Sequence, residues 1–204
     1  KFRKAVAAGE LEDVQRMLDA DPALMFSRDE RGLSMVFIAH TNGHDAVRDL
    51  LVERGAQLDL IDAIVAGAED RVKEILDRMP GAAEVPNAYG WTAMCAAADV
   101  GNESMITALI SAAGSYDIML ESGPKIAPVC MALTHEDMDA ATRMANTMLS
   151  NGADPNIEQS DGSRPIHIAA ARGNLYILDQ LIRKGADVGA MNGAGQTAKQ
   201  IAAD

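Results

Sequence analysis

Aromatic side chains make up only 3% of this 204-residue chain, although 48% of its residues are hydrophobic. The core must therefore consist of Ala, Leu, Ile, Val and Met, which suits closely stacked thin helices better than a sheet sandwich with large inward rings. No apolar run approaches the roughly 18 residues of a membrane span, and no signal peptide is visible. We expect an all-α, cytoplasmic protein that avoids membranes. A leader removed before Lys1 is left open.

Cysteine is scarce as well, because the chain contains only Cys95 and Cys130. Two cysteines do not form a disulfide framework. These two fall at equivalent positions of neighbouring repeat units, which are defined below. Equivalent points on stacked units should lie about 10 Å apart, beyond the reach of a disulfide. We therefore expect free, buried thiols that bind no metal.

Basic residues are also in the minority, with 18 Lys and Arg against 30 Asp and Glu, a net charge of −12. Phosphate binding requires a basic face, so this balance argues against nucleic acid as the main partner. A glycine-rich phosphate loop is absent too, since Gly193-Ala194-Gly195 lacks the strand-to-helix context and the lysine of such a loop. The sequence therefore predicts no nucleotide cofactor.

The most informative stretch is DGSRPIHIAAARGNLYILDQLIRKGADVGAMN, residues 161–192. Asp161-Gly162 is a turn dipeptide, and Pro165 occupies a first helical position, where its missing N–H costs nothing. Small residues then indicate a short helix that ends near Gly173. Leucines and isoleucines at helical spacing indicate a second helix, which Gly185 ends in a left-handed cap. Two such helices cannot bury their apolar faces alone and require copies of themselves on either side.

This stretch resembles the ankyrin repeat, whose signature includes T-P-L-H-x-A. The residues that carry the resemblance are Pro165-Ile166-His167-Ile168-Ala169-Ala170, Gly173 and Gly185-Ala186-Asp187-Val188. Arg164 departs from the pattern, because the family usually has a threonine there that caps the first helix. The resemblance implies an all-α ankyrin-repeat solenoid of about six helix pairs with short turn or hairpin fingers.

The glycine between the two helices of each unit sets the register of the repeats. It appears at Gly9, Gly43, Gly67, Gly101 and Gly173, with Glu136 as the nearest substitute in the fifth unit. We expect a single domain over 1–204 whose units lie at 1–28, 29–59, 60–86, 87–120, 121–157 and 158–192, followed by a partial cap at 193–204.

Two units depart from the regular period of about 33 residues. Only 24 residues separate Gly43 from Gly67, so we expect the finger before the third unit to be missing. The fifth unit carries about one extra helical turn around His135–Asp139. We expect this acidic segment to be a solvated turn between lengthened helices. A metal or small-molecule site there is the alternative, but for a metal the segment lacks a second histidine or cysteine in register.

Two neighbouring aromatics stand out, because Tyr89 and Trp91 flank Gly90 in the fourth finger. One interpretation makes them exposed anchors for a partner, since fingers point to solvent. In the other, Trp91 folds back over the neighbouring finger. His167 occupies the family's own histidine position, which implies hydrogen bonds to the backbone of adjacent turns rather than catalysis.

The resemblance implies a non-catalytic scaffold that binds a protein partner through finger tips and the concave first-helix face. We expect a monomer without cofactor or metal. The alternative is a regulatory or spacer module of a larger protein whose enzymatic domain lies outside this segment. The candidate partner-binding residues map to fingers or to first-helix ends, and they are Arg31, Thr41, Asn42, Tyr89, Trp91, Asp99, Asp161 and Arg172.

Overall fold

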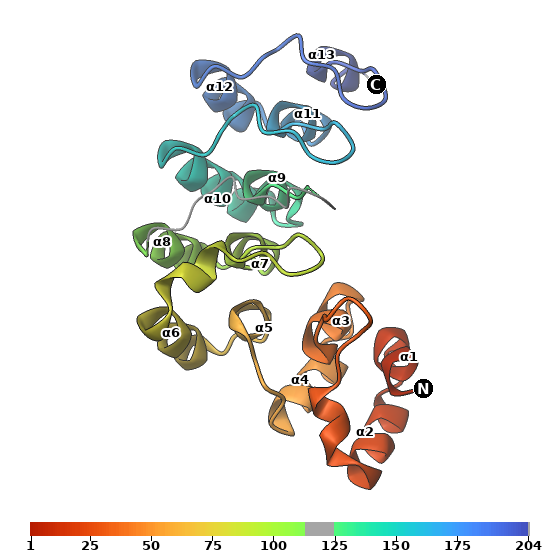
Figure 1. Ribbon diagram of the computed structural model, residues 1–204. Coiled ribbons are helices and arrows are strands. Elements are labelled where there is room, and N and C mark those ends of the chain that lie inside the picture. The colour runs from red at the N-terminus through yellow and green to blue at the C-terminus, as the bar shows by residue number, and fades with distance from the viewer. Residues whose placement is uncertain (113–124, 204) are drawn as a thin grey trace. The chain divides into compact units, whose positions relative to one another are not determined.

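The computed structural model describes residues 1–112 and 125–203, whose regular structure is helical. They form two compact units, Lys1–Ala82 and Ala83–Asp204. The helices of the first unit are α1 (Phe2–Ala8), α2 (Leu11–Ala20), α3 (Met35–Thr41), α4 (Asp45–Glu53), α5 (Leu60–Val65) and α6 (Glu69–Arg78). Those of the second are α7 (Ala93–Asp99), α8 (Glu103–Ser111), α9 (Pro128–Thr134), α10 (Met138–Ser150), α11 (Pro165–Ala171), α12 (Leu175–Arg183) and α13 (Ala198–Ile201) (Figure 1).

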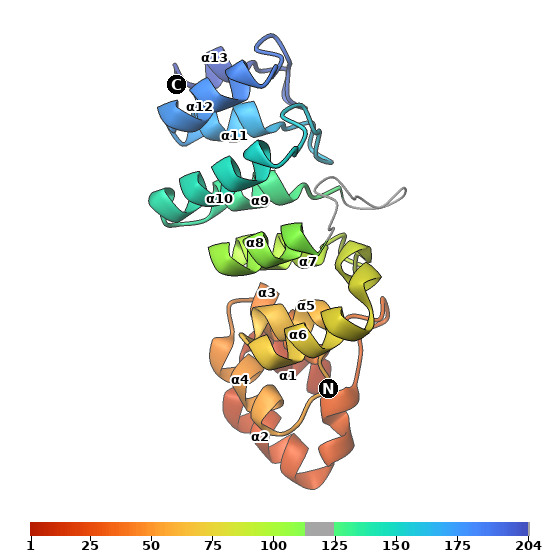
Figure 2. The same cartoon turned by 90° about the vertical axis from the view of Figure 1, so that its left-hand side faces the viewer.

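Within each unit, a short helix pairs with the helix that follows it, and each pair packs on the next pair. In the second unit, α7 packs on α9 and α9 on α11, while α8, α10 and α12 form the second row. Figure 2 shows these three pairs as successive layers. The all-α repeat architecture expected from the sequence is therefore confirmed.

The tight turn inside each pair depends on a glycine. Gly43 and Gly173 have φ angles of 73° and 64°, in the left-handed region that residues with a Cβ rarely adopt. The fifth pair turns differently, because His135 follows α9 with a φ of −56°. Only the second helix of this pair is long, since α10 has 13 residues whereas α9 has 7, as α7 and α11 do. The expectation that both helices are lengthened is therefore wrong.

The fingers share one five-residue geometry. In each, the first N–H donates to the carbonyl of the fifth residue, and the fourth residue is a glycine with positive φ. These fingers are Asp29–Leu33, Asn87–Trp91, Gln159–Ser163 and Asn192–Gln196. Residues 56–59 instead run directly into α5 without a turn, which confirms the missing finger.

The last two fingers touch through their backbones. The N–H of Gly193 donates to the carbonyl of Asp161 over 3.0 Å. A Cβ atom at Gly162 would lie 2.6 Å from the nitrogen of Gly193, which is closer than real Cβ contacts allow. Both fingers therefore need glycine where they meet.

The first helices begin with side-chain caps of the expected kind. The Ser34 hydroxyl accepts from the Phe37 N–H at the start of α3, and the Thr92 hydroxyl accepts from the Cys95 N–H at the start of α7. At α11, where Arg164 replaces threonine, the Nδ1 atom of His167 accepts from the Arg164 N–H instead. The histidine thus satisfies a backbone donor that the usual hydroxyl does not reach.

The core follows the composition. Alanines fill the buried face of α7, and Leu109, Met144, Met148 and Leu181 are among the largest fully buried side chains. The unit boundaries expected at 120 and 121 lie outside the described residues, and the single domain over 1–204 stays a prediction. Residues 193–203 add a finger and the short helix α13, which Thr197 caps.

Candidate functional site

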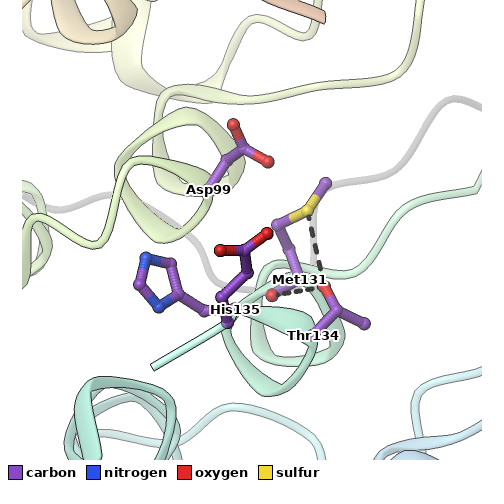
Figure 3. Close-up of a pocket in the computed structure, with 5 residues that line it drawn as sticks. Asp99, Met131, Thr134 and His135 are labelled. Atoms are coloured by element: carbon purple, nitrogen blue, oxygen red, sulfur yellow. Dashed lines mark hydrogen bonds between the residues drawn. The ribbon is translucent and has the colours of Figure 1, made fainter. Parts of the chain in front are cut away.

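A cavity of about 340 Å³ opens where the ends of two neighbouring first helices meet, inside the second unit. Asp99 contributes the last residue of α7, and Met131 and Thr134 come from the last turns of α9. His135 and Glu136 follow α9 directly and complete the lining. Figure 3 shows Asp99 on one helix and Met131, Thr134 and His135 on and after the next.

Neighbouring hydrogen bonds fix several walls of this cavity. The Thr134 hydroxyl donates to the Met131 carbonyl over 2.8 Å (Figure 3). The Nδ1 atom of His135 accepts from the Asp137 N–H over 3.2 Å, so the proton of the neutral ring lies on Nε2. The ring also lies against the turn between α7 and α8, since a Cβ atom at Gly101 would be 2.6 Å from Nε2.

Arg172, which follows α11 in the next repeat, hydrogen-bonds to the backbone at the edge of the cavity. One terminal nitrogen of Arg172 donates to the Thr134 carbonyl over 2.9 Å, and the other donates to the Glu136 carbonyl over 3.3 Å. The Thr134 carbonyl ends α9, where a positive charge is favourable, and the Glu136 carbonyl lies in the turn that follows. Arg172, expected to contact a partner, therefore has a structural task beside the cavity.

The charge of the cavity is negative, because Asp99 and Glu136 line it and Asp137 follows directly. The N–H groups of Ala140 and then Asp139 hold the pKa of Asp137 below its usual value, because Asp137 caps α10. The cavity offers carboxylates, a hydroxyl and a thioether, which suits a cationic side chain with an aliphatic stem.

The other candidate residues are dispersed. Arg31, Tyr89 and Asp161 lie on three different fingers with exposed side chains, and Tyr89 is 39% exposed. Thr41 and Asn42 are exposed at the end of α3, where both side chains donate to carbonyls of their own helix. Of the candidates, the structure brings only Asp99 and Arg172 to the borders of one cavity.

Trp91 is buried, with 5% of its surface exposed. The interpretation that made it an exposed anchor is therefore wrong, and the inward-packed alternative holds. The reason is its place in the finger, since Trp91 is the fifth residue and Leu33, the fifth residue of another finger, is buried to the same 5%. The fifth side chain of these two fingers is buried, so of the two aromatics in the finger Asn87–Trp91 only Tyr89 is exposed.

Sequence reasoning missed Met131 and Thr134 and treated Glu136 as part of a solvated turn. The rule that selected Thr41 and Asp99, the last residue of a first helix, selects Thr134 when it is applied to α9. The rule could not be applied to α9 from the sequence, because the fifth unit has no glycine to mark the end of its first helix.

The cysteines are buried and free. The Cys95 thiol lies 3.6 Å from the Ile126 carbonyl and donates to it. Burial raises the pKa of Cys95 to about 11 and raises that of Cys130 further. Both thiols are thus protonated at neutral pH, which makes them packing groups rather than nucleophiles. In residues 1–112 and 125–203, no group of three or more His, Cys, Asp and Glu is placed to hold a metal.

His167 has the backbone bonds that the resemblance implied. Besides accepting from Arg164, its ring lies 3.0 Å from the Ala190 carbonyl through Nε2. Because Nδ1 accepts, Nε2 carries the proton and donates to Ala190. One ring nitrogen thereby caps the start of α11, and the other holds the segment before α13 to this helix.

Known proteins share this repeat. The family model described as Ankyrin repeat matches residues 161–193. The B-cell lymphoma 3 protein homolog of Mus musculus is 29% identical over 171 residues, which is 78% of this chain and 37% of the mouse protein. Protein fem-1 homolog A of Danio rerio is 45% identical over 58 residues, 28% of this chain and 9% of that protein. The chain thus spans well under half the length of these relatives.

A solved structure has the same fold. The ankyrin repeat domain of Bcl-3 superposes with a TM-score of 0.58 at 21% identity, and the match covers 98% of this chain and 92% of that one. Among the helices of the described residues, none is long and apolar enough to cross a membrane. Residues 161–193 thus match an ankyrin repeat, and the chain shares the fold of an ankyrin repeat domain.

Proposed function

We propose that this chain is a non-catalytic module that binds a protein partner along its finger tips and first-helix ends. The observation that carries the proposal is the acidic cavity between α7 and α9, because it lies on the face where the first helices end and opens to solvent. The fingers support it, since their backbones are tied by their own hydrogen bonds and project exposed side chains such as Arg31 and Tyr89.

The partner should present a lysine or arginine to this cavity. Asp99 and Glu136 supply two carboxylates, and the chain as a whole carries a net charge of −12. Complementary charge of this kind accelerates association and selects the partner. Met131 offers a soft apolar wall along which the stem of such a side chain can pack.

The test uses the full chain as bait to capture partners from its native lysate, followed by affinity measurement with the purified partner. The double variant Asp99→Asn/Glu136→Gln keeps the shape of the cavity and removes its charge. We expect binding to weaken by about tenfold or more, chiefly at low salt. Asp77→Asn, an exposed carboxylate on α6, is the matched control and should leave the affinity unchanged.

Equal affinity of the double variant and the control would reject the cavity as the centre of the interface. Tyr89→Ala then tests the finger tips separately, because Tyr89 is exposed whereas its neighbour Trp91 is buried. If neither variant alters binding of the captured partner, the proposed surface is wrong.

A further inference from the structure

One buried carboxyl group in the first unit is without a full set of hydrogen-bond partners. Asp62, the third residue of α5, is only 1% exposed. Its Oδ1 atom accepts from the Ser34 hydroxyl over 2.5 Å, a contact between neighbouring repeats. Its Oδ2 atom is buried and has no hydrogen-bond partner among the residues that the structure describes. A buried carboxylate in this state is costly, because water that would solvate the charge is excluded.

The surrounding charges do not offset that cost. Burial is the largest influence, and the neighbouring carboxylate of Asp59 adds to it. The Ser34 hydroxyl, the backbone at Asp59 and the charge of Arg28 act in the opposite direction but are weaker in sum. Together these influences raise the pKa of Asp62 to about 7.

The cation nearest α5 on helix α6 is Arg71, which donates to the Leu58 carbonyl and pairs with Glu74. Arg71 is not among the groups that shift the pKa of Asp62. Helix α3 contributes the neutral hydroxyl of Ser34, and its basic residue His40 lies in its last turn, at the opposite end. Helix α6 turns the apolar side chains of Val72 and Ile75 into the core. Arg28 lies 3.7 Å from a carboxylate oxygen of Asp59, so its positive charge acts on Asp59 as well as on Asp62.

We propose that Asp62, with one oxygen bonded to Ser34 and the other buried without a partner, makes the stability of residues 1–82 respond to pH. The neutral acid is tolerated in the folded chain, whereas the ionised form favours opening of α5 and its contact with α3. Asp62 lies next to the missing finger. The segment before α5 therefore has no turn that could bring a further backbone N–H to the Asp62 carboxyl group.

The direction of the response follows from linkage. The ordinary pKa of 3.8 applies to the unfolded chain, and the pKa of about 7 applies to the folded one. Between these values the folded state holds a proton that the unfolded state has released, so stability falls as pH rises from about 4 to about 7. The opening equilibrium changes by up to about tenfold per pH unit in this window and levels off above it.

Carbon NMR of the carboxyl group gives the direct test in the full chain. The carboxyl resonance of Asp62 should titrate with a midpoint near 7, far from the ordinary value of 3.8. The exposed carboxyl of Asp70 on α6 serves as the internal reference. A midpoint for Asp62 below about 5 would overturn the proposal, because the folded and unfolded chains would then hold the proton almost equally.

Asp62→Asn provides the second test, because asparagine has the shape of the neutral acid and does not ionise. Hydrogen exchange of the α3 and α5 amides is compared between variant and unmodified chain at each pH, which removes the pH dependence of intrinsic exchange. We expect similar protection near pH 4, where the fall in stability has barely begun. Near pH 8 the unmodified chain should exchange at least about tenfold faster than the variant.

Asp70→Asn is the matched control and should follow the unmodified chain at both pH values. If the amides of α3 and α5 exchanged with the same pH dependence in Asp62→Asn and in the unmodified chain, the proposal would be contradicted. If Asp62→Asn fails to fold, the carboxyl titration of the unmodified chain still decides the question.

Discussion

The two compact units of the chain use different chemistry to tie successive repeats together. In residues 83–203 most of these ties join a side chain or backbone group to the backbone of the next repeat. They include His167 with Ala190, Arg172 with Thr134, Asn156 with Gly185 and Asp187, Lys125 with Ser160, and Gly193 with Asp161. In residues 1–82, ion pairs are more prominent, namely Arg3 with Glu30, Arg28 with Asp59 and Arg54 with Asp19, beside the His44 ring at the Ala7 carbonyl. The second unit also has one such pair, Arg143 with Glu103.

The difference follows from the fingers. A finger carries backbone N–H and C=O groups to its neighbour, and these groups make fixed, neutral hydrogen bonds. Where residues 56–59 form no finger, the ion pair of Arg28 with Asp59 lies at the surface, together with the buried pair of Ser34 and Asp62. Surface ion pairs are weak and screened by salt. Losing one finger therefore changes how strongly the adjacent repeats depend on pH and salt.

The apolar part of the stack should be the same in both units, and it provides the largest expected effect. Leu51 on α4 and Leu181 on α12 hold the same place in their helices and are both fully buried. We expect Leu51→Ala and Leu181→Ala each to lower the free energy of unfolding by about 2–5 kcal/mol, as measured by urea denaturation. Ile182→Ala, at a position 52% exposed, is the control and should cost much less.

If one leucine variant lost less than about 0.5 kcal/mol of unfolding free energy and the other lost about 2–5 kcal/mol, the two units would differ in their apolar cores as well. The distinction drawn from polar contacts alone would then be incomplete.

The buried histidine tests the neutral ties of the second unit. His167→Ala leaves the Arg164 N–H and the Ala190 carbonyl without their partner and should cost about 1–3 kcal/mol. His167→Gln is the matched control, because Gln200 holds the same position in α13 and accepts from its own capping N–H over 2.8 Å. Denaturation should find the glutamine variant closer to the unmodified chain. Equal loss in both variants would mean that the ring packs rather than bonds.

The ion pairs of the first unit should give the smallest effect. Arg54 and Asp19 approach to 2.7 Å with side chains 33% and 59% exposed. Arg54→Ala should therefore cost less than about 1 kcal/mol at low salt and still less at high salt. Urea denaturation at two salt concentrations measures this, since urea itself is uncharged. A cost above about 2 kcal/mol that salt leaves unchanged would disprove the contrast between the units.

Features determined by neighbouring residues could be predicted from the sequence. The glycine turns, the Ser34 and Thr92 caps and the absent finger between Gly43 and Gly67 each depend on a few adjacent positions. Their local conformational rules hold before any packing is known.

Features determined by packing between repeats were not accessible in the same way. Trp91 sits in a finger, and only the depth of its side chain distinguishes an anchor from a core residue. Asp62 has the sequence appearance of an acid that complements a helix N-terminus, but α3 buries it. The cavity beside Asp99 depends on how α9 ends, in the one unit where the glycine register is lost.

The backbone contact between Gly162 and Gly193 makes the spacing of two fingers independent of the side chains at their tips. The contact between these fingers is made by main-chain atoms, so we expect it to persist when an exposed tip residue such as Ala194 is replaced. A library that varies those tips and leaves both glycines in place would change chemistry at constant spacing. The two glycines make this pair of fingers suitable for altering partner preference without altering the geometry on which binding depends.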